Sequence, residues 1–167
     1  LRAADASHSE QIKWGNESVF NEEHNTLGLF SGVLGGQIVL AGGTSDDYSR
    51  WGRNAVCLSE NAGFALYEDV LSKPLAYGAS ITLSDGILCI GGRDSSQCYE
   101  DVFFVTMQQG KLNVSEDWPP LPFPLSNAAG ALLDNKVYLF GGRKSVSPSR
   151  LSDSFFVLDL SNKSRGW

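Results

Sequence analysis

The feature that most constrains the fold of this chain is a repeat of about 50 residues. Three apolar runs each end in a glycine pair: IVLAGG at 38–43, ILCIGG at 87–92 and VYLFGG at 137–142. Two further landmarks keep the same step, since the Pro-Leu-Ala at 74–76 returns as Pro-Leu-Ser at 124–126, and DVFFV at 101–105 returns as DSFFV at 153–157. Self-similarity at a period of this size predicts an array of like units rather than one irregular domain.

One period contains four short strand patterns. In the second period these are GASITL at 78–83, ILCI at 87–90, DVFFVTM at 101–107 and KLNVSEDW at 111–118. Asp85-Gly86 and Gln109-Gly110 fall between strand pairs and predict hairpin turns. The third period repeats the pattern with GALL, VYLF and SFFVLDL around Asp134-Asn135, and the first is less regular, with AVCLSE and AGFALYED as its later strands. Four antiparallel strands in each period predict the blades of a β-propeller.

Glycine and tryptophan have structural explanations in such a fold. Eighteen glycines are too many for a helical domain, because each costs about 1 kcal/mol relative to alanine in a helix interior. A glycine pair at a strand end permits close backbone approach and a positive φ. Trp118 and Trp167 are expected in the last strand of their blades, with Trp167 at or within the final strand of the third period, where each ring packs against the next blade.

Composition excludes several classes of function. Thirteen basic and 19 acidic residues give a net charge of −6, which argues against nucleic acid as a partner. No apolar run approaches the roughly 20 residues of a spanning helix, and the first residues lack the pattern of a signal peptide, so we expect a soluble segment without a membrane partner; the compartment stays open. Neither the three cysteines nor His8 and His24 have the spacing of a metal site, so no metal is expected.

The repeat is similar to the kelch motif over residues 29–167. The phrases PLAYGASITLSDGILCIGG, QCYEDVFFV and PPLPFPLSNAAGALLDNKVYLFGG more narrowly resemble the cyclically permuted branch of the N-acetylneuraminate epimerase (sialic acid mutarotase) family. This resemblance implies a six-bladed propeller, of which this chain holds about three blades, and an enzyme that interconverts the α and β anomers of a free sialic acid with no cofactor. The expected fold class is therefore all-β, a partial kelch-type β-propeller of about three four-stranded antiparallel blades.

The repeat also divides the chain. We expect an N-terminal polar segment at 1–28 that could be a strand of a neighbouring blade, an irregular first blade at 29–73, a second at 74–123 and a third at 124–167 that is truncated at its last strand. A closed propeller takes about 4 to 8 blades. We therefore expect a fragment whose remaining blades lie in the same longer chain, with pairing to a second copy as the alternative way to close the ring.

The loops after the glycine pairs carry the candidate chemistry. Exchange of anomers needs one group to take the proton of the anomeric hydroxyl, another to protonate the ring oxygen, and a cation to hold the substrate carboxylate. Guanidinium groups recognise carboxylates bidentately, so Arg93, Arg143 and Arg53 are candidates for binding sialic acid or a related sugar acid. Asp94 and Tyr99, in the same loops, are the other candidates for binding this substrate. In the alternative interpretation the arginines are solvated or pair with nearby carboxylates such as Asp94, and the tyrosines serve packing.

No catalytic residue is assigned. The resemblance implies that the proton-transferring acid follows an Asn-Gly-Glu element, and this sequence has none. The sequence thus favours part of a sialic acid mutarotase, and the alternative is a kelch-repeat module that binds a protein partner without catalysis. A copper oxidase built on the same repeat is excluded, because both histidines lie outside the repeats.

Overall fold

The computed structural model describes residues 27–59 and 63–167, and over these residues the chain is almost entirely β-structure. The first sheet is a four-stranded antiparallel meander of β1 (Phe30–Leu34), β2 (Gln37–Ala41), β3 (Ala55–Ser59) and β4 (Gly63–Tyr67). The second repeats it with β5 (Ala79–Thr82), β6 (Ile87–Ile90), β7 (Val102–Gln108) and β8 (Lys111–Ser115). In both sheets the strands pair in chain order, as expected for a propeller blade.

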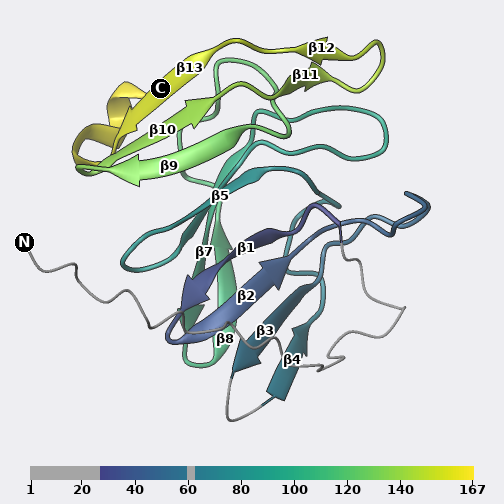
Figure 1. Ribbon diagram of the computed structural model, residues 1–167. Coiled ribbons are helices and arrows are strands. Elements are labelled where there is room, and N and C mark those ends of the chain that lie inside the picture. Colours follow the sequence, from purple (N-terminus) through teal and green to yellow (C-terminus); the bar gives the residue numbers. More distant parts are fainter. Residues whose placement is uncertain (1–26, 60–62) are drawn as a thin grey trace, which may run out of the picture.

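The third sheet departs from this plan. It contains β9 (Ala129–Leu133), β10 (Lys136–Phe140) and β13 (Phe155–Asp159), in the order β13-β10-β9. The loop after β10 forms a separate hairpin of β11 (Arg143–Ser145) and β12 (Arg150–Leu151), which the sequence analysis did not predict. Figure 1 shows this sheet above the other two, with the β11–β12 hairpin extending from one end.

The expectation for Trp167 is wrong. After β13 the chain forms the 3-10 helix η1 (Leu160–Arg165), begun by Asp159, whose carboxylate accepts a hydrogen bond from the Ser161 amide. Trp167 follows this helix, and its indole Nε1 donates to the Pro119 carbonyl at 2.9 Å. A tertiary contact explains the difference, because the Trp167 indole bonds to the segment that precedes the third sheet. Trp118 likewise lies outside a strand, just beyond β8, but its ring does face the next repeat, with the Lys163 ammonium 4.2 Å from its centroid.

Most other local predictions are confirmed. The two uncertain strands of the first period are β3 and β4, and Asp134-Asn135 forms the β9–β10 turn with φ of 49° and 58°. Positive φ at both central residues is the requirement of the tight turn that matches the twist of paired strands, and Asp and Asn tolerate it better than most residues. The turn chemistry therefore sets the hairpin register locally.

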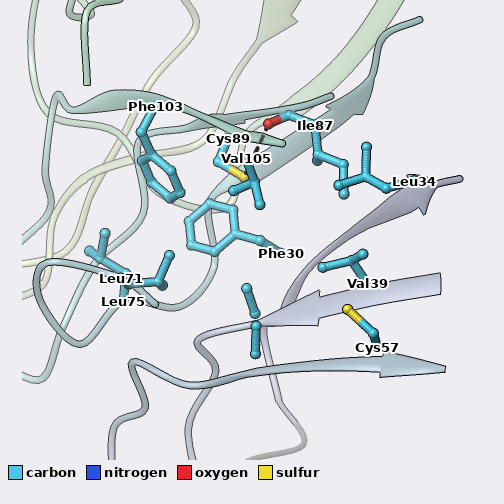
Figure 2. Close-up of a cluster of buried hydrophobic side chains, with 12 residues drawn as sticks. Phe30, Leu34, Val39, Cys57, Leu71, Leu75, Ile87, Cys89, Phe103 and Val105 are labelled. Atoms are coloured by element: carbon cyan, nitrogen blue, oxygen red, sulfur yellow. Dashed lines mark hydrogen bonds between the residues drawn. The ribbon is translucent and has the colours of Figure 1, made fainter. Parts of the chain in front are cut away.

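The core consists of two apolar clusters, one between each pair of successive sheets. Figure 2 shows the first, in which Phe30, Val39 and Cys57 of the first sheet meet Ile87, Cys89, Phe103 and Val105 of the second. The rings of Phe30 and Phe103 meet edge to face at 5.2 Å, a favoured geometry for aromatic pairs. The second cluster is built in the same way from the second and third sheets. Stability is thus distributed over repeated interfaces between neighbouring sheets.

The glycine pairs are needed at these interfaces. Gly91 has a φ of 63°, and a Cβ added to it would collide with the backbone carbonyl oxygen of Leu125, in the segment that leads into the third sheet. The next amide, that of Gly92, donates to the same Leu125 oxygen at 2.8 Å. In the first sheet Gly42 and Gly43 make the equivalent approach to Leu75. These two pairs therefore receive the backbone that leads into the following sheet.

Candidate functional site

The loops that follow β2 and β6 extend from the same end of the sheets as the β11–β12 hairpin (Figure 1). Thr44, Arg93 and Arg143 occupy the same place in the three repeats. Each exchanges two backbone hydrogen bonds with the residue that leads into its own sheet; for Arg93 the partner is Ala76, at 2.8 and 2.9 Å, and for Arg143 it is Ser126, at 2.7 and 2.9 Å. Two of the candidate arginines are thus structurally equivalent, and the first repeat has a threonine in that place.

The next residue along each leading segment has a left-handed backbone. Gly28, Tyr77 and Asn127 have φ of 66°, 61° and 57°. They form a chain between blades, because the Tyr77 amide donates to the Gly28 carbonyl at 2.7 Å and the Asn127 amide donates to the Tyr77 carbonyl at 2.6 Å. Glycine and asparagine suit such a φ, whereas a bulky side chain there carries strain of roughly 1–3 kcal/mol. Strain of this kind concentrates at functional sites, which directs attention to Tyr77.

Arg93 lies among three aromatic rings. Its guanidinium carbon is 4.9 Å from the ring centroid of Tyr77, 5.0 Å from that of Trp51 and 5.8 Å from that of Tyr48. These four residues, which we call the arginine–aromatic cluster, come from two successive repeats. Tyr48 is 49% exposed, so the cluster is open to solvent. Cation–π contact of this sort holds a guanidinium in place without neutralising its charge.

The polar groups of the cluster make only some of the hydrogen bonds that they could make. Arg93 donates from Nη1 to the Asp94 carbonyl oxygen at 3.2 Å, while its Nε is buried and has no hydrogen-bond partner among the described residues. The Tyr77 hydroxyl donates to that of Tyr48 at 3.4 Å. Burial, followed by this hydrogen bond, raises the pKa of Tyr77 to about 12, although the nearby Arg93 charge opposes the shift. At neutral pH the Tyr77 phenol is therefore protonated and neutral.

The loop that carries Tyr48 and Trp51 is held by its own side chains. Asp47 accepts hydrogen bonds from the Ser45 hydroxyl at 2.5 Å and the Ser49 amide at 3.0 Å, and these bonds lower the pKa of the Asp47 carboxyl to about 2. The Trp51 indole in turn donates to the Tyr48 carbonyl at 3.1 Å. The positions of the Tyr48 and Trp51 rings are thus fixed by hydrogen bonds within their own loop as well as by their contact with Arg93.

Asp94 and Tyr99 are brought together, but their polar atoms serve the loop after β6. The Asp94 carboxylate accepts from the amides of Ser96 and Gln97 at 2.7 and 2.9 Å and from the Tyr99 hydroxyl at 2.7 Å. Burial alone would raise the pKa of Asp94, but these hydrogen bonds outweigh it and lower the pKa to about 2. The Asp94 carboxylate already accepts these hydrogen bonds. It is therefore better suited to holding the loop beside Arg93 than to contacting an anionic ligand.

Arg53 is placed differently. Its guanidinium forms an ion pair with Asp69, and the two side chains are 40% and 68% exposed. It does not share the place in the repeat that Arg93 and Arg143 occupy. The sequence alternative in which an arginine pairs with a carboxylate therefore describes Arg53, while Arg93 contacts aromatic faces and a carbonyl.

Sequence reasoning missed Tyr48 and Trp51. It weighed the charged residues of this loop and passed over the two aromatic residues of the run DYSRW at 47–51. Two aromatic residues in a polar loop are a usable signal, since Tyr and Trp combine a large apolar face with a hydrogen-bonding group. Only the structure shows that both rings lie against Arg93, which belongs to the next repeat.

A cavity of about 220 Å³ lies between the second repeat and the segment at 71–75 that joins the first sheet to the second, and it is lined in part by Leu71, Phe103 and Trp118. At its rim Lys73 donates to both oxygens of the Asp101 carboxylate at 3.1 Å, and its ammonium lies 4.5 Å from the centre of the Tyr99 ring. The only cation of this lining, Lys73, is paired with a carboxylate, in contrast to Arg93. The arginine–aromatic cluster is therefore the stronger candidate site.

Comparison with known proteins supports the repeat assignment. Residues 124–165 match the family model described as the Kelch motif. Together with the blade-like antiparallel sheets, this identifies the fold as all-β, a partial kelch-type β-propeller. No helix in the described part of the chain has the length and apolarity to cross a membrane.

Two curated proteins named N-acetylneuraminate epimerase are similar to part of the chain, one from Brucella suis (strain ATCC 23445 / NCTC 10510) and one from Brucella melitensis biotype 1 (strain ATCC 23456 / CCUG 17765 / NCTC 10094 / 16M). Each is 36% identical over 58 residues, which is 35% of this chain. The match spans only 13% of the length of each relative. The relationship is thus of the kelch type, and it leaves the activity of this chain to be argued from the site.

Proposed function

We propose that the chain is part of a sialic acid mutarotase and that the arginine–aromatic cluster binds the sugar acid. The observation that carries the proposal is Arg93, a charged guanidinium held by three aromatic rings with no carboxylate partner in the described residues. The 36% identity with two N-acetylneuraminate epimerases over 58 residues supports the choice of substrate class.

The chemistry of the cluster suits a sugar acid. A planar guanidinium binds a carboxylate with two parallel hydrogen bonds, and its attraction persists in a protein of net negative charge. The phenol of Tyr77, kept neutral by its raised pKa, can donate to or accept from a sugar hydroxyl. Arg143, at the equivalent place in the next repeat, offers a second cation for the same class of ligand.

The cluster binds substrate in this proposal but does not move the protons of ring opening. Mutarotation takes the proton from the anomeric hydroxyl and returns one to the ring oxygen, so the best base has a pKa near the working pH. Tyr77, with a pKa of about 12, is too weakly acidic to cycle near neutrality, and Asp94, with a pKa of about 2, is too weak a base. The proton-transferring groups therefore belong to other blades of the complete propeller.

Binding of N-acetylneuraminate to this chain, followed by saturation-transfer NMR or calorimetry, tests the binding step. Arg93→Ala should weaken binding at least about tenfold, because charge-assisted hydrogen bonds contribute roughly 1.5–3 kcal/mol. Arg53→Ala is the matched control, since it removes the same charge from an exposed ion pair. Equal binding by both variants and the unaltered chain would contradict the role of Arg93.

The reaction is tested separately by proton NMR of freshly dissolved sialic acid. A closed propeller that contains these blades should speed the approach to anomeric equilibrium over the buffer rate. Absence of any acceleration would refute the proposed activity.

The alternative is a protein-binding module, and the composition of the cluster favours it over other non-enzymatic functions. Tyr, Trp and Arg dominate the energetic hot spots of protein interfaces. If N-acetylneuraminate neither binds nor protects Tyr48 and Tyr77 from chemical modification, this second function is the better explanation of the same residues.

A further inference from the structure

One place in the repeat, just before each sheet, holds a different residue each time. Gly28, Tyr77 and Asn127 occupy it and share a left-handed backbone, with φ of 66°, 61° and 57°. The Tyr77 ring lies against Arg93 of its own repeat, and the arginine at the equivalent place beside Asn127 is Arg143. Glycine and asparagine both suit this φ, so the backbone alone does not explain why the third repeat has a side-chain amide there.

Asn127 lies directly beside the arginine–aromatic cluster. Its backbone amide donates to the Tyr77 carbonyl oxygen at 2.6 Å, so the backbones of the two residues are in contact. A sugar acid is larger than one side chain, and a ligand that contacts the Tyr77 ring is long enough to reach the residue next to it. Asn127 thus places a polar side chain of the third repeat beside a cluster that the first two repeats form.

The side-chain amide of Asn127 is hydrogen-bonded at its oxygen but not at its nitrogen. Its Oδ1 accepts from the Ser126 hydroxyl at 3.0 Å, and Ser126 is 1% exposed. Its Nδ2 makes no hydrogen bond in the part of the chain that the structure describes. Because an amide nitrogen carries two donors, Asn127 offers both of them to a ligand, from a side chain that a buried neighbour already orients.

The surroundings of Asn127 are polar where those of Tyr77 are aromatic. In the loop after β6, Cys98 pairs at the place that Trp51 holds in the loop after β2, so a thiol replaces the indole. Arg143 makes no ion pair and no ring contact among the described residues. The junction between the second and third sheets therefore presents hydrogen-bond donors, whereas the junction between the first and second presents aromatic rings.

We propose that Asn127 is a specificity-determining residue of the sugar-acid site, and that its Nδ2 donates to an acceptor oxygen of the ligand whose carboxylate is bound at Arg93. This inference rests on the proposed function, because a sugar acid must occupy the arginine–aromatic cluster. A few placed polar groups fix the orientation of a ligand in a site with aromatic walls. A site that hydrogen-bonds one group of its ligand also discriminates against ligands that lack this group.

Asn127→Gly removes the amide without straining the backbone, because glycine suits a φ of 57° and holds the same place in the first repeat. Calorimetry or saturation-transfer NMR should show N-acetylneuraminate bound roughly 2- to 12-fold more weakly, which corresponds to the loss of one neutral hydrogen bond. Acetate, titrated as a probe of Arg93 alone, should bind this variant as it binds the unaltered chain. Asn135→Gly is the matched control, because Asn135 has a φ of 58° at the end of β10 remote from Arg143, and it should leave the binding of both ligands unchanged.

Asn127→Asp keeps the size of the side chain but replaces its donors with a negative charge, so it should weaken the binding of N-acetylneuraminate more than Asn127→Gly does. If Arg93→Ala weakens this binding and Asn127→Gly does not, the role of Asn127 is wrong while the proposed function stands. Equal weakening of acetate and N-acetylneuraminate by Asn127→Gly would also overturn the inference, because the substitution would then act on Arg93. If the unaltered chain does not bind N-acetylneuraminate, the proposed function fails and the inference fails with it.

Discussion

Alanine substitution at two equivalent glycines separates backbone strain from contact between blades. Gly91 and Gly141 have the same place in successive repeats and φ of 63° and 71°. Alanine at either position carries the strain of a left-handed backbone, roughly 1–2 kcal/mol. At Gly91 the new methyl would also collide with the Leu125 carbonyl, whereas at Gly141 the nearest contact is an ordinary 3.7 Å.

The collision adds two costs to Gly91→Ala. Forcing a methyl group into a packed interface costs about 1–3 kcal/mol. Moving the Leu125 carbonyl also weakens its 2.8 Å hydrogen bond from the Gly92 amide, a contribution of about 0.5–1.5 kcal/mol. We therefore expect Gly91→Ala to lower the free energy of unfolding by about 2.5–6.5 kcal/mol and Gly141→Ala by about 1–2 kcal/mol.

Urea unfolding of both variants, at a concentration at which the chain is monomeric, measures the difference. A difference of about 1.5–4.5 kcal/mol should appear in the thermal midpoint as well, at about 2–4 °C per kcal/mol for a chain of this size. Equal destabilisation by the two substitutions would refute the reasoning, because it would mean that backbone strain alone explains the glycine pair.

Three further predictions follow from named contacts. Phe103→Ala should destabilise the chain by about 3–5 kcal/mol in urea unfolding, because Phe103 is 4% exposed and packs on Phe30, whereas Val33→Ala at a 51% exposed site should cost far less. The Asp94 carboxyl has a pKa lowered from 3.8 to about 2, so its stabilisation is complete above pH 3.8 and is lost as the pH falls toward 2; Asp94→Asn should flatten the thermal midpoint over that interval, and an unchanged pH profile would contradict the loop network. The Tyr77 phenol has a pKa raised from 10.0 to about 12, so its contribution is present below pH 10 and is lost as the pH rises toward 12; absorbance titration should show a tyrosine that ionises near pH 12 and that Tyr77→Phe removes.

The repeat allowed much of the fold to be predicted, because its signals are local. Apolar alternation, the Asp134-Asn135 turn and the glycine pairs each express a requirement of the backbone at that position, and the hairpins formed where these signals stood. The end of the third repeat was mispredicted, because its outcome depends on contacts made elsewhere. Trp167 bonds to Pro119, 48 residues earlier, and the chain before it forms a 3-10 helix instead of a strand.

The candidate site was predicted only in part, for a related reason. Position in the repeat correctly grouped Arg93 with Arg143, since equivalent positions make equivalent backbone bonds. It did not show that the Arg53 charge is already paired, because the partner, Asp69, is 16 residues away in the chain. Two of the three rings around Arg93, those of Tyr48 and Trp51, come from another repeat, so their convergence has no sequence signature of its own.

The sequence by itself determined the period, the strands and the places where only glycine fits, because these depend on φ, on side-chain alternation and on turn chemistry within a few residues. Only the tertiary structure decided which charged side chains lack an ion-pair partner and which apolar faces are exposed to solvent. Arg93 has no carboxylate partner among the described residues, because the neighbouring blade presents the rings of Tyr48 and Trp51 to its guanidinium. Phe140 and Phe155 are exposed although their equivalents Ile90 and Val102 are core residues, because burial depends on what packs against a face and not on the residues that form it.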